Sequence, residues 1–333
     1  MALLDIDALS VTLPGMARPI LDRIELTVAA GETVALVGES GSGKSVTARA
    51  ALGLFPAGAD LAGRVRVEDI DLVGADAARL REVRTGIAAM IFQDPRAGIS
   101  PVRRIGDFLT EALRLVGGWS RARADARAAE LLAAVGLPDP ERHLRQFPHE
   151  MSGGMLQRVM IAAALCGEPR LLLCDEPTTA LDVATQAEIL ALLGRLRRER
   201  DLGLLLITHD IELAAASCDR IYVMYAGRIV ETATADELFA RPRHPYTAGL
   251  LGSSPPQEGP LTRLAPIPGA PMSLLESATG CAFAPRCRFA EPGRCDQAPP
   301  VLEPHGAGRV ACHRADELEP PVLAHLAPDS EDR

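Results

Sequence analysis

Short apolar runs separated by helix-like segments occupy the first two thirds of the chain. Residues 9–13 and 24–28 alternate apolar and polar positions on either side of Pro14-Gly15, which predicts an antiparallel β element. Continuous, mostly apolar runs at residues 32–37, 87–92, 171–174 and 204–208 predict buried strands. A helical segment from Gln186 to Arg200 connects the last two runs, so we expect a parallel βαβ unit there.

The pattern changes to helix between residues 97 and 165. Apolar residues from Ile105 to Val116 recur at helical spacing, and a second helix is expected from about Ser120 to Val135. Residues 221–225 and 228–231, joined by Ala226-Gly227, predict a hairpin with a two-residue turn. Beyond about residue 240, Pro, Gly and short helical pieces dominate. We therefore expect a domain at 1–240 with a helical insert at about 97–165, and an extension at 241–333.

Composition narrows the classes of partner. The 333 residues are 47% hydrophobic, enough for one large domain and a smaller one. The formal net charge is −9 and no basic run has interleaved aromatics, so nucleic acid is not expected as a partner. The sequence shows no N-terminal signal pattern and no apolar stretch of roughly 18 residues, which predicts a cytoplasmic protein, soluble or peripheral to a membrane.

One stretch carries the clearest chemistry. Gly38-Glu39-Ser40-Gly41-Ser42-Gly43-Lys44-Ser45 matches the P-loop template G-x-x-x-x-G-K-[ST] at every fixed position. Lys44 is the only lysine among 35 Lys and Arg residues. A compact ammonium on a slim stem suits a phosphate cradle that a planar guanidinium would not enter. A glycine-rich turn could fit the template by chance. The expected order of a strand at 32–37, the loop and a helix at 46–54 favours a nucleotide site.

The motif predicts a role for each of its parts. The backbone N–H groups of the loop and of the following helix start would face a polyphosphate, Lys44 would reach the β- and γ-phosphates, and the Ser45 hydroxyl would bind Mg²⁺. The predicted ATP-binding residues here are Gly38, Ser40, Gly41, Ser42, Gly43, Lys44, Ser45 and Val46.

A second strand end supplies acidic chemistry. The apolar run 171–174 is followed by Asp175-Glu176. An Asp at the end of a core strand can hold Mg²⁺, and the adjacent Glu can orient and deprotonate the attacking water. An isolated Asp-Glu at a strand end is more often only solvated, but the P-loop upstream favours the catalytic interpretation.

Four further motifs lie along the chain, two of them between the P-loop and Asp175-Glu176 and two after Asp175-Glu176. They are Gln93, Ser152-Gly153-Gly154 at a helix start, Ala180-Leu181-Asp182 and His209. With the P-loop and Asp175-Glu176, this arrangement resembles the ATP-binding cassette family over residues 1 to about 235. The resemblance implies an α/β fold with a RecA-like parallel sheet, an antiparallel β subdomain and a helical subdomain.

The family resemblance also implies an ATP-hydrolysing dimer with two nucleotides between the chains. Lys44, Ser45, Gln93, Asp175, Glu176 and His209 would come from one chain, and Ser152, Gly153 and Gly154 from the other. Glu176, His209 and Gln93 would be catalytic, with Gln93 sensing Mg²⁺ and the water. Asp182 would lie at the interface between chains.

The C-terminal third narrows the resemblance. Arg243–Thr247, Ile267–Gly269 and Gly280–Cys287 resemble the extension of ATPases from oligopeptide and dipeptide importers. This implies a peripheral protein at the cytoplasmic face of the cell membrane. Its partners would be a second ATPase subunit, often a different chain, two transmembrane permeases and an extracytoplasmic substrate-binding protein. The alternatives are a nickel or opine importer ATPase, another transporter of the same family, or a soluble cassette ATPase acting on nucleic acid.

Four of the seven cysteines lie close together in the extension: Cys281, Cys287, Cys295 and Cys312. A cytosolic compartment disfavours disulfides, so the cluster favours metal. No pair has the spacing of two to four residues that zinc ribbons and fingers use. Wide spacing suits an iron–sulfur cluster better, and the family resemblance implies [4Fe–4S]. Zinc, and unligated thiols or disulfides, are the alternatives.

Overall fold

The computed structural model describes residues 2–16, 18–179, 181–253, 266–273, 276 and 279–318. Ala180 of the predicted Ala180-Leu181-Asp182 motif, and parts of the predicted extension, lie outside these residues. Contacts divide the chain into two compact units, which are described separately. The first comprises Met1–Leu4, Val28–Glu32 and Arg66–Ile207, and the second comprises Asp5–Thr27, Thr33–Val65 and Thr208–Arg333.

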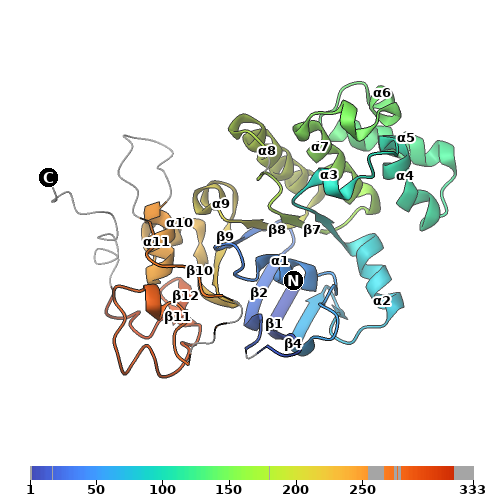
Figure 1. Ribbon diagram of the computed structural model, residues 1–333. Coiled ribbons are helices and arrows are strands. Elements are labelled where there is room, and N and C mark those ends of the chain that lie inside the picture. Colours follow the sequence, from blue (N-terminus) through green and yellow to red (C-terminus); the bar gives the residue numbers. More distant parts are fainter. Residues whose placement is uncertain are drawn as a thin grey trace. The chain divides into compact units, whose positions relative to one another are not determined.

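The first unit contains a parallel sheet and the helical insert (Figure 1). Strands β6 (Ala88–Ile91), β7 (Leu171–Asp175) and β8 (Gly203–Thr208) run parallel, with β7 between the other two. β7 and β8 are buried along their whole length, as expected for strands covered on both faces. The connection from β7 to β8 is α8 (Val183–Arg200), so the predicted βαβ unit is confirmed.

Other elements of this unit precede β7. They are β5 (Ile70–Asp71), α2 (Ala77–Glu82), a π-helix (Val83–Ile87), α3 (Pro95–Gly98), α4 (Ile105–Leu115), α5 (Arg121–Ala134), α6 (Pro140–Arg145), a 3₁₀ turn (Pro148–Glu150), α7 (Gly153–Ala164) and a second 3₁₀ turn (Leu165–Gly167).

Helices α4 and α5 confirm the helices expected from the apolar spacing. α4 buries Ile105, Leu109 and Leu113, which lie four residues apart on one face. α5 begins after Ser120, whose side chain accepts a hydrogen bond from the Arg123 N–H and so caps the helix. α4, α5 and α7 pack against one another through these apolar faces.

The second unit contains the P-loop and the extension. Its elements are β1 (Ala2–Thr12), β2 (Leu21–Ala29), β3 (Thr33–Val37), α1 (Lys44–Ala50), β4 (Asp60–Val67), α9 (Ile211–Ser217), β9 (Arg220–Tyr225), β10 (Arg228–Thr234), α10 (Ala235–Ala240), α11 (Pro245–Ser253), a 3₁₀ turn (Ala284–Arg286), β11 (Glu303–His305) and β12 (Gly308–Val310). β1, β2 and β4 belong mainly to this unit and form a sheet with β1 in the middle.

Five strands of this unit lie side by side in the order β11-β12-β10-β9-β3. β3 pairs parallel with β9, and β9 and β10 form the predicted hairpin. Its turn residues Ala226 and Gly227 have φ of 47° and 83°, the left-handed values that a two-residue turn of this kind requires. β12 of the extension pairs antiparallel with β10, which the sequence did not predict. The extension thus continues a core sheet.

Candidate functional site

The P-loop connects β3 to α1 in the predicted order. Gly41 and Gly43 have φ of 79° and 110°, where a side chain would be strained. Gly38 is needed for a different reason: a Cβ atom built there would lie 2.2 Å from the backbone oxygen of Met224 in β9. α1 begins at Lys44, two residues before the helix start expected from the sequence.

Lys44 is held inside the loop that it serves. Its side chain is only 5% exposed, and Nζ donates hydrogen bonds to the backbone oxygens of Gly38 (2.7 Å) and Glu39 (3.0 Å). Ser42 Oγ is buried and has no hydrogen-bond partner among the residues that the structure describes. A buried ammonium beside an unsatisfied hydroxyl fits a site for a polar, anionic ligand, because such groups are costly to bury without one.

Gln93 and Glu176 lie together in the first unit. Gln93 follows β6 and Glu176 follows β7, and the Gln93 Nε2 donates to Glu176 Oε2 at 2.9 Å. The Thr179 hydroxyl donates to the same oxygen at 2.9 Å. Glu176 has φ of 47°, and its N–H donates to the Ile207 oxygen in β8. Asp175 is the last residue of β7 and is 5% exposed.

The contribution of Thr179 was missed from the sequence. A threonine three residues after the Glu gives no signal of its own, and only the turn after β7 brings its hydroxyl to the carboxylate. Two donors on one carboxylate oxygen fix the direction in which the other oxygen can accept a proton.

The Ser-Gly-Gly motif begins α7, also in the first unit. Ser152 is the helix cap, and its Oγ accepts a hydrogen bond from the Met155 N–H. A Cβ on Gly154 would lie 2.7 Å from Cγ2 of Thr185 in α8, so a larger residue would separate these helices. Asp182 caps α8 by accepting from both the N–H and the hydroxyl of Thr185, and these bonds lower its pKa.

His209 follows β8 and precedes Asp210, which caps α9 by accepting hydrogen bonds from the Glu212 and Leu213 N–H groups. The His209 side chain is exposed. The structure therefore positions the predicted histidine at the carboxyl end of a parallel strand, where ligands of open α/β sheets bind.

The four cysteines of the extension line one small cavity of about 20 Å³, together with Phe283 and Phe289. Burial raises the pKa of the Cys281 thiol, and raises that of Cys287 and of Cys312 to about 11. Within the part of the chain that the structure describes, no group of three or more His, Cys, Asp or Glu side chains could hold a metal ion. The donor residues are thus gathered, but their thiols are not arranged as a metal site.

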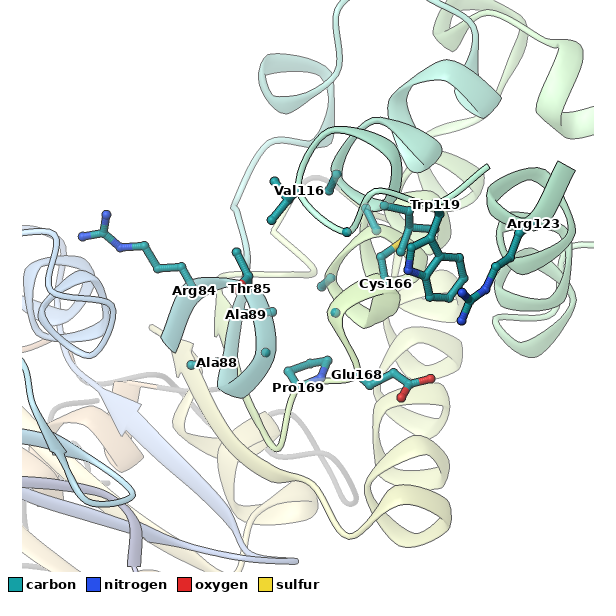
Figure 2. Close-up of a pocket in the computed structure, with 17 residues that line it drawn as sticks. Arg84, Thr85, Ala88, Ala89, Val116, Trp119, Arg123, Cys166, Glu168 and Pro169 are labelled. Carbon is teal, nitrogen blue, oxygen red and sulfur yellow. The ribbon is translucent and has the colours of Figure 1, made fainter. Parts of the chain in front are cut away.

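A larger pocket, of about 550 Å³, lies in the first unit (Figure 2). Its lining comes from the segment 84–89, from the end of α4 with Trp119, and from residues 163–169, and much of it is Ala and Gly. The Arg123 guanidinium lies 3.7 Å from the centre of the Trp119 ring at one wall. Leu115 and Val116, on the same α4 end, are 75% and 46% exposed. No helix among the described residues combines the length and apolar character needed to cross a membrane.

The strand, glycine loop and buried lysine, with a second strand that ends at Asp175 and is followed by Glu176, define a P-loop ATPase. Comparisons with known proteins make the assignment specific. Residues 21–179 match the model of the ABC transporter family, and residues 230–295 match that of the oligopeptide/dipeptide transporter C-terminal region. The chain belongs to the ATP-binding cassette family, in the group that carries this C-terminal region.

Similar proteins cover nearly all of the chain. It is 47% identical to a probable peptide ABC transporter ATP-binding protein of Sinorhizobium fredii, over 90% of each chain. It is 44% identical to the dipeptide transport ATP-binding protein DppD of Haemophilus influenzae, over 94% of this chain and 96% of the relative.

Solved cassettes confirm the predicted α/β fold. CbiO1 of Clostridium perfringens, part of an ABC transporter complex, superposes with a TM-score of 0.63 at 25% identity, over 72% of this chain and 91% of its own. The dimeric post-hydrolysis cassette MJ0796, bound to ADP and phosphate, gives 0.60 at 28% identity, over 70% and 98%.

Proposed function

We propose that this chain is the ATP-hydrolysing subunit of a membrane importer of oligopeptides or dipeptides. The observation that carries the proposal is the match of residues 230–295 to the C-terminal region of oligopeptide/dipeptide transporters. The test is co-purification with a substrate-binding protein, which is then titrated with peptides and with nickel or opine ligands. Peptide binding supports the proposal, and binding of nickel chelates or opines alone contradicts it.

The predicted site residues divide into phosphate-binding and hydrolytic groups. Lys44 and the loop N–H groups bind the phosphates, and the N–H of Val46 faces them from the first turn of α1. Gln93 and Glu176 orient the attacking water, Glu176 accepts its proton, and His209 holds the γ-phosphate. The hydrogen bonds that Gln93 and Thr179 give to Glu176 support this assignment. Ser45, Asp175 and Gln93 would hold Mg²⁺, which would supply charge neutralisation on the phosphates.

A second ATPase subunit completes the site. Ser152, Gly153 and Gly154 of one chain face the nucleotide of the other, and Asp182 lies where the chains meet. The capped start of α7 supports a phosphate-facing role, because helix N-termini attract anions. We place the nucleotide-binding domain at 1–240, its helical subdomain at about 97–165 and the extension at 241–333. The partner ATPase is a different but related chain.

The remaining partners are two permeases, which hold this chain at the cytoplasmic face of the membrane, and an extracytoplasmic binding protein. The pocket at Trp119 is the docking site for a short cytoplasmic helix of a permease. Its Ala and Gly lining admits an apolar side chain, and Val116 is one of the lining residues (Figure 2). The exposed Leu115, which precedes Val116, extends the contact. Arg123 at the wall would pair with an acidic residue of that helix.

Trp119 is the only tryptophan and reports directly on this pocket. Peptides copied from the cytoplasmic loops of the co-purified permeases, without tryptophan, should shift its fluorescence. L115E should weaken that response, whereas V301E, at an exposed apolar residue of the extension, should not. An unchanged response in L115E, or equal losses in both variants, contradicts the docking site.

The four cysteines bind a [4Fe–4S] cluster with a structural role. Four thiols lining one cavity with two phenylalanines support this, because iron–sulfur clusters use Cys ligands. The thiols must separate around the cluster, since the cavity is small. Anaerobically purified protein should be brown and contain iron, and C287S should lose the colour. Colourless wild-type protein without iron contradicts the cluster, and stoichiometric zinc would identify the alternative.

A further inference from the structure

An arginine of the cysteine-bearing extension forms an ion pair with a residue of the P-loop. Arg286 lies in the 3₁₀ turn between Cys281 and Cys287, and its side chain is only 5% exposed. Its guanidinium forms a two-pronged ion pair with Glu39, the second residue of the P-loop: Nη1 donates to Oε2 at 2.6 Å and Nη2 donates to Oε1 at 3.0 Å. Such paired, charge-assisted bonds fix both distance and orientation.

Every polar group of Glu39 is held. Its N–H donates to the Tyr246 hydroxyl at 2.9 Å, and its backbone oxygen accepts from Lys44 Nζ at 3.0 Å and from the Ser42 N–H at 3.2 Å. One residue therefore joins Arg286 of the extension to the ammonium of Lys44. Tyr246 belongs to α11, so two separate segments of the C-terminal region contact the same P-loop residue.

The side chain of Arg286 is fixed by further contacts besides Glu39. Nε of Arg286 donates to the Pro268 oxygen at 2.9 Å, so the guanidinium is also held on its other side. Around it, Tyr225, Tyr246 and Phe283 pack with ring centres 4.8 to 5.3 Å apart. The hydrogen bonds with Glu39 raise the pKa of Arg286, and its guanidinium is charged. A buried charge with a fixed partner resists movement, because separating the pair would leave each charge uncompensated.

We propose that Arg286 is a positioning residue for ATP binding. By fixing Glu39, it sets the P-loop backbone and Lys44 in the conformation that receives phosphates. A loop that is already ordered loses less conformational freedom when ligand binds, so preorganisation appears as affinity. Gln93 and Glu176, the predicted hydrolytic residues, belong to the other unit. The effect therefore falls on the Kd and KM for ATP, and much less on kcat at saturating ATP.

The test compares R286Q, E39Q and the double variant in the full chain, with a fluorescent ATP analogue and Mg²⁺ as the probe. We expect each single variant to bind the ATP analogue about tenfold more weakly than the wild type. A change of this size is typical of the coupling between two separate sites in one protein. Because both remove the same ion pair, the double variant should bind no more weakly than the singles. R286K should recover part of the affinity, since it restores the charge without the fork.

Arg309 provides a matched control. It joins the same extension to β2 through an ion pair with Glu25, and neither residue belongs to the P-loop. R309Q should leave the affinity for the analogue unchanged. Wild-type affinity in R286Q, or equal losses in R286Q and R309Q, would overturn the proposal. If R286Q does not fold, the single variants Y246F and E39Q replace it in the test. Y246F removes only the hydroxyl that accepts the Glu39 N–H. Wild-type affinity in both of these variants would overturn the proposal.

Discussion

Replacing Glu176 by glutamine separates its charge from its position. One oxygen of Glu176 accepts hydrogen bonds from Gln93 and Thr179, both at 2.9 Å. In E176Q the amide oxygen can occupy that place and keep both bonds, so the change removes the base with little disturbance of its neighbours. General base catalysis contributes about 10²- to 10⁴-fold, or roughly 3 to 5 kcal/mol of barrier.

The assay is phosphate release by the assembled transporter, with ATP binding measured in parallel. We expect hydrolysis to fall by about 10²- to 10⁴-fold while ATP still binds, which traps a closed ATPase dimer. T179V is the companion variant, since it removes one donor and keeps the carboxylate. One hydrogen bond is worth about 0.5 to 1.5 kcal/mol, so its rate should fall only about two- to tenfold. Turnover of E176Q at the wild-type rate would refute Glu176 as the base.

Two further predictions concern stability. G38A should lower both the melting temperature and the affinity for ATP, because its Cβ would lie 2.2 Å from the backbone oxygen of Met224. In G41A the Cβ would meet no described atom within 4 Å, so this variant should show only the smaller effect of backbone strain. Equal effects of the two variants would contradict this reasoning. Burial raises the pKa of Glu231 to about 7 and lowers that of His244 to about 3. Glu231 therefore makes stability fall as pH rises from 4.5 to 7, and His244 makes it rise from 3 to 6.5. E231Q removes the contribution of Glu231 and leaves the rise in stability that His244 causes. The urea midpoint of E231Q should therefore increase more steeply between pH 5 and 6.5 than that of the wild type. Parallel profiles of the two proteins would contradict the assignment.

The elements that sequence predicted well are those whose local pattern has one solution. A short apolar run such as Leu171–Cys174 buries both faces only within a covered sheet, and Ala226-Gly227 supplies the left-handed turn that a tight hairpin needs. Helix ends were predicted less accurately: α1 begins at Lys44 and ends at Ala50, whereas the sequence predicts residues 46–54.

Features that depend on distant partners could not be predicted. Glu303–His305 has no apolar alternation, and it forms a strand because β12 pairs with it and with β10. The contact between Arg286 and Glu39 joins residues 247 apart, and neither residue type indicates the other. The motifs predicted Gln93 and Glu176 separately, and the folded chain brings their side chains together.

The burial of Lys44 gives the P-loop a second use as a reporter. A protease that cleaves only after lysine has one target bond in this chain, between Lys44 and Ser45. That bond lies at the start of α1, and its lysine is 5% exposed, so the folded loop cannot enter a protease cleft. Cleavage into two fragments then requires local opening, and its rate measures how often this segment unfolds.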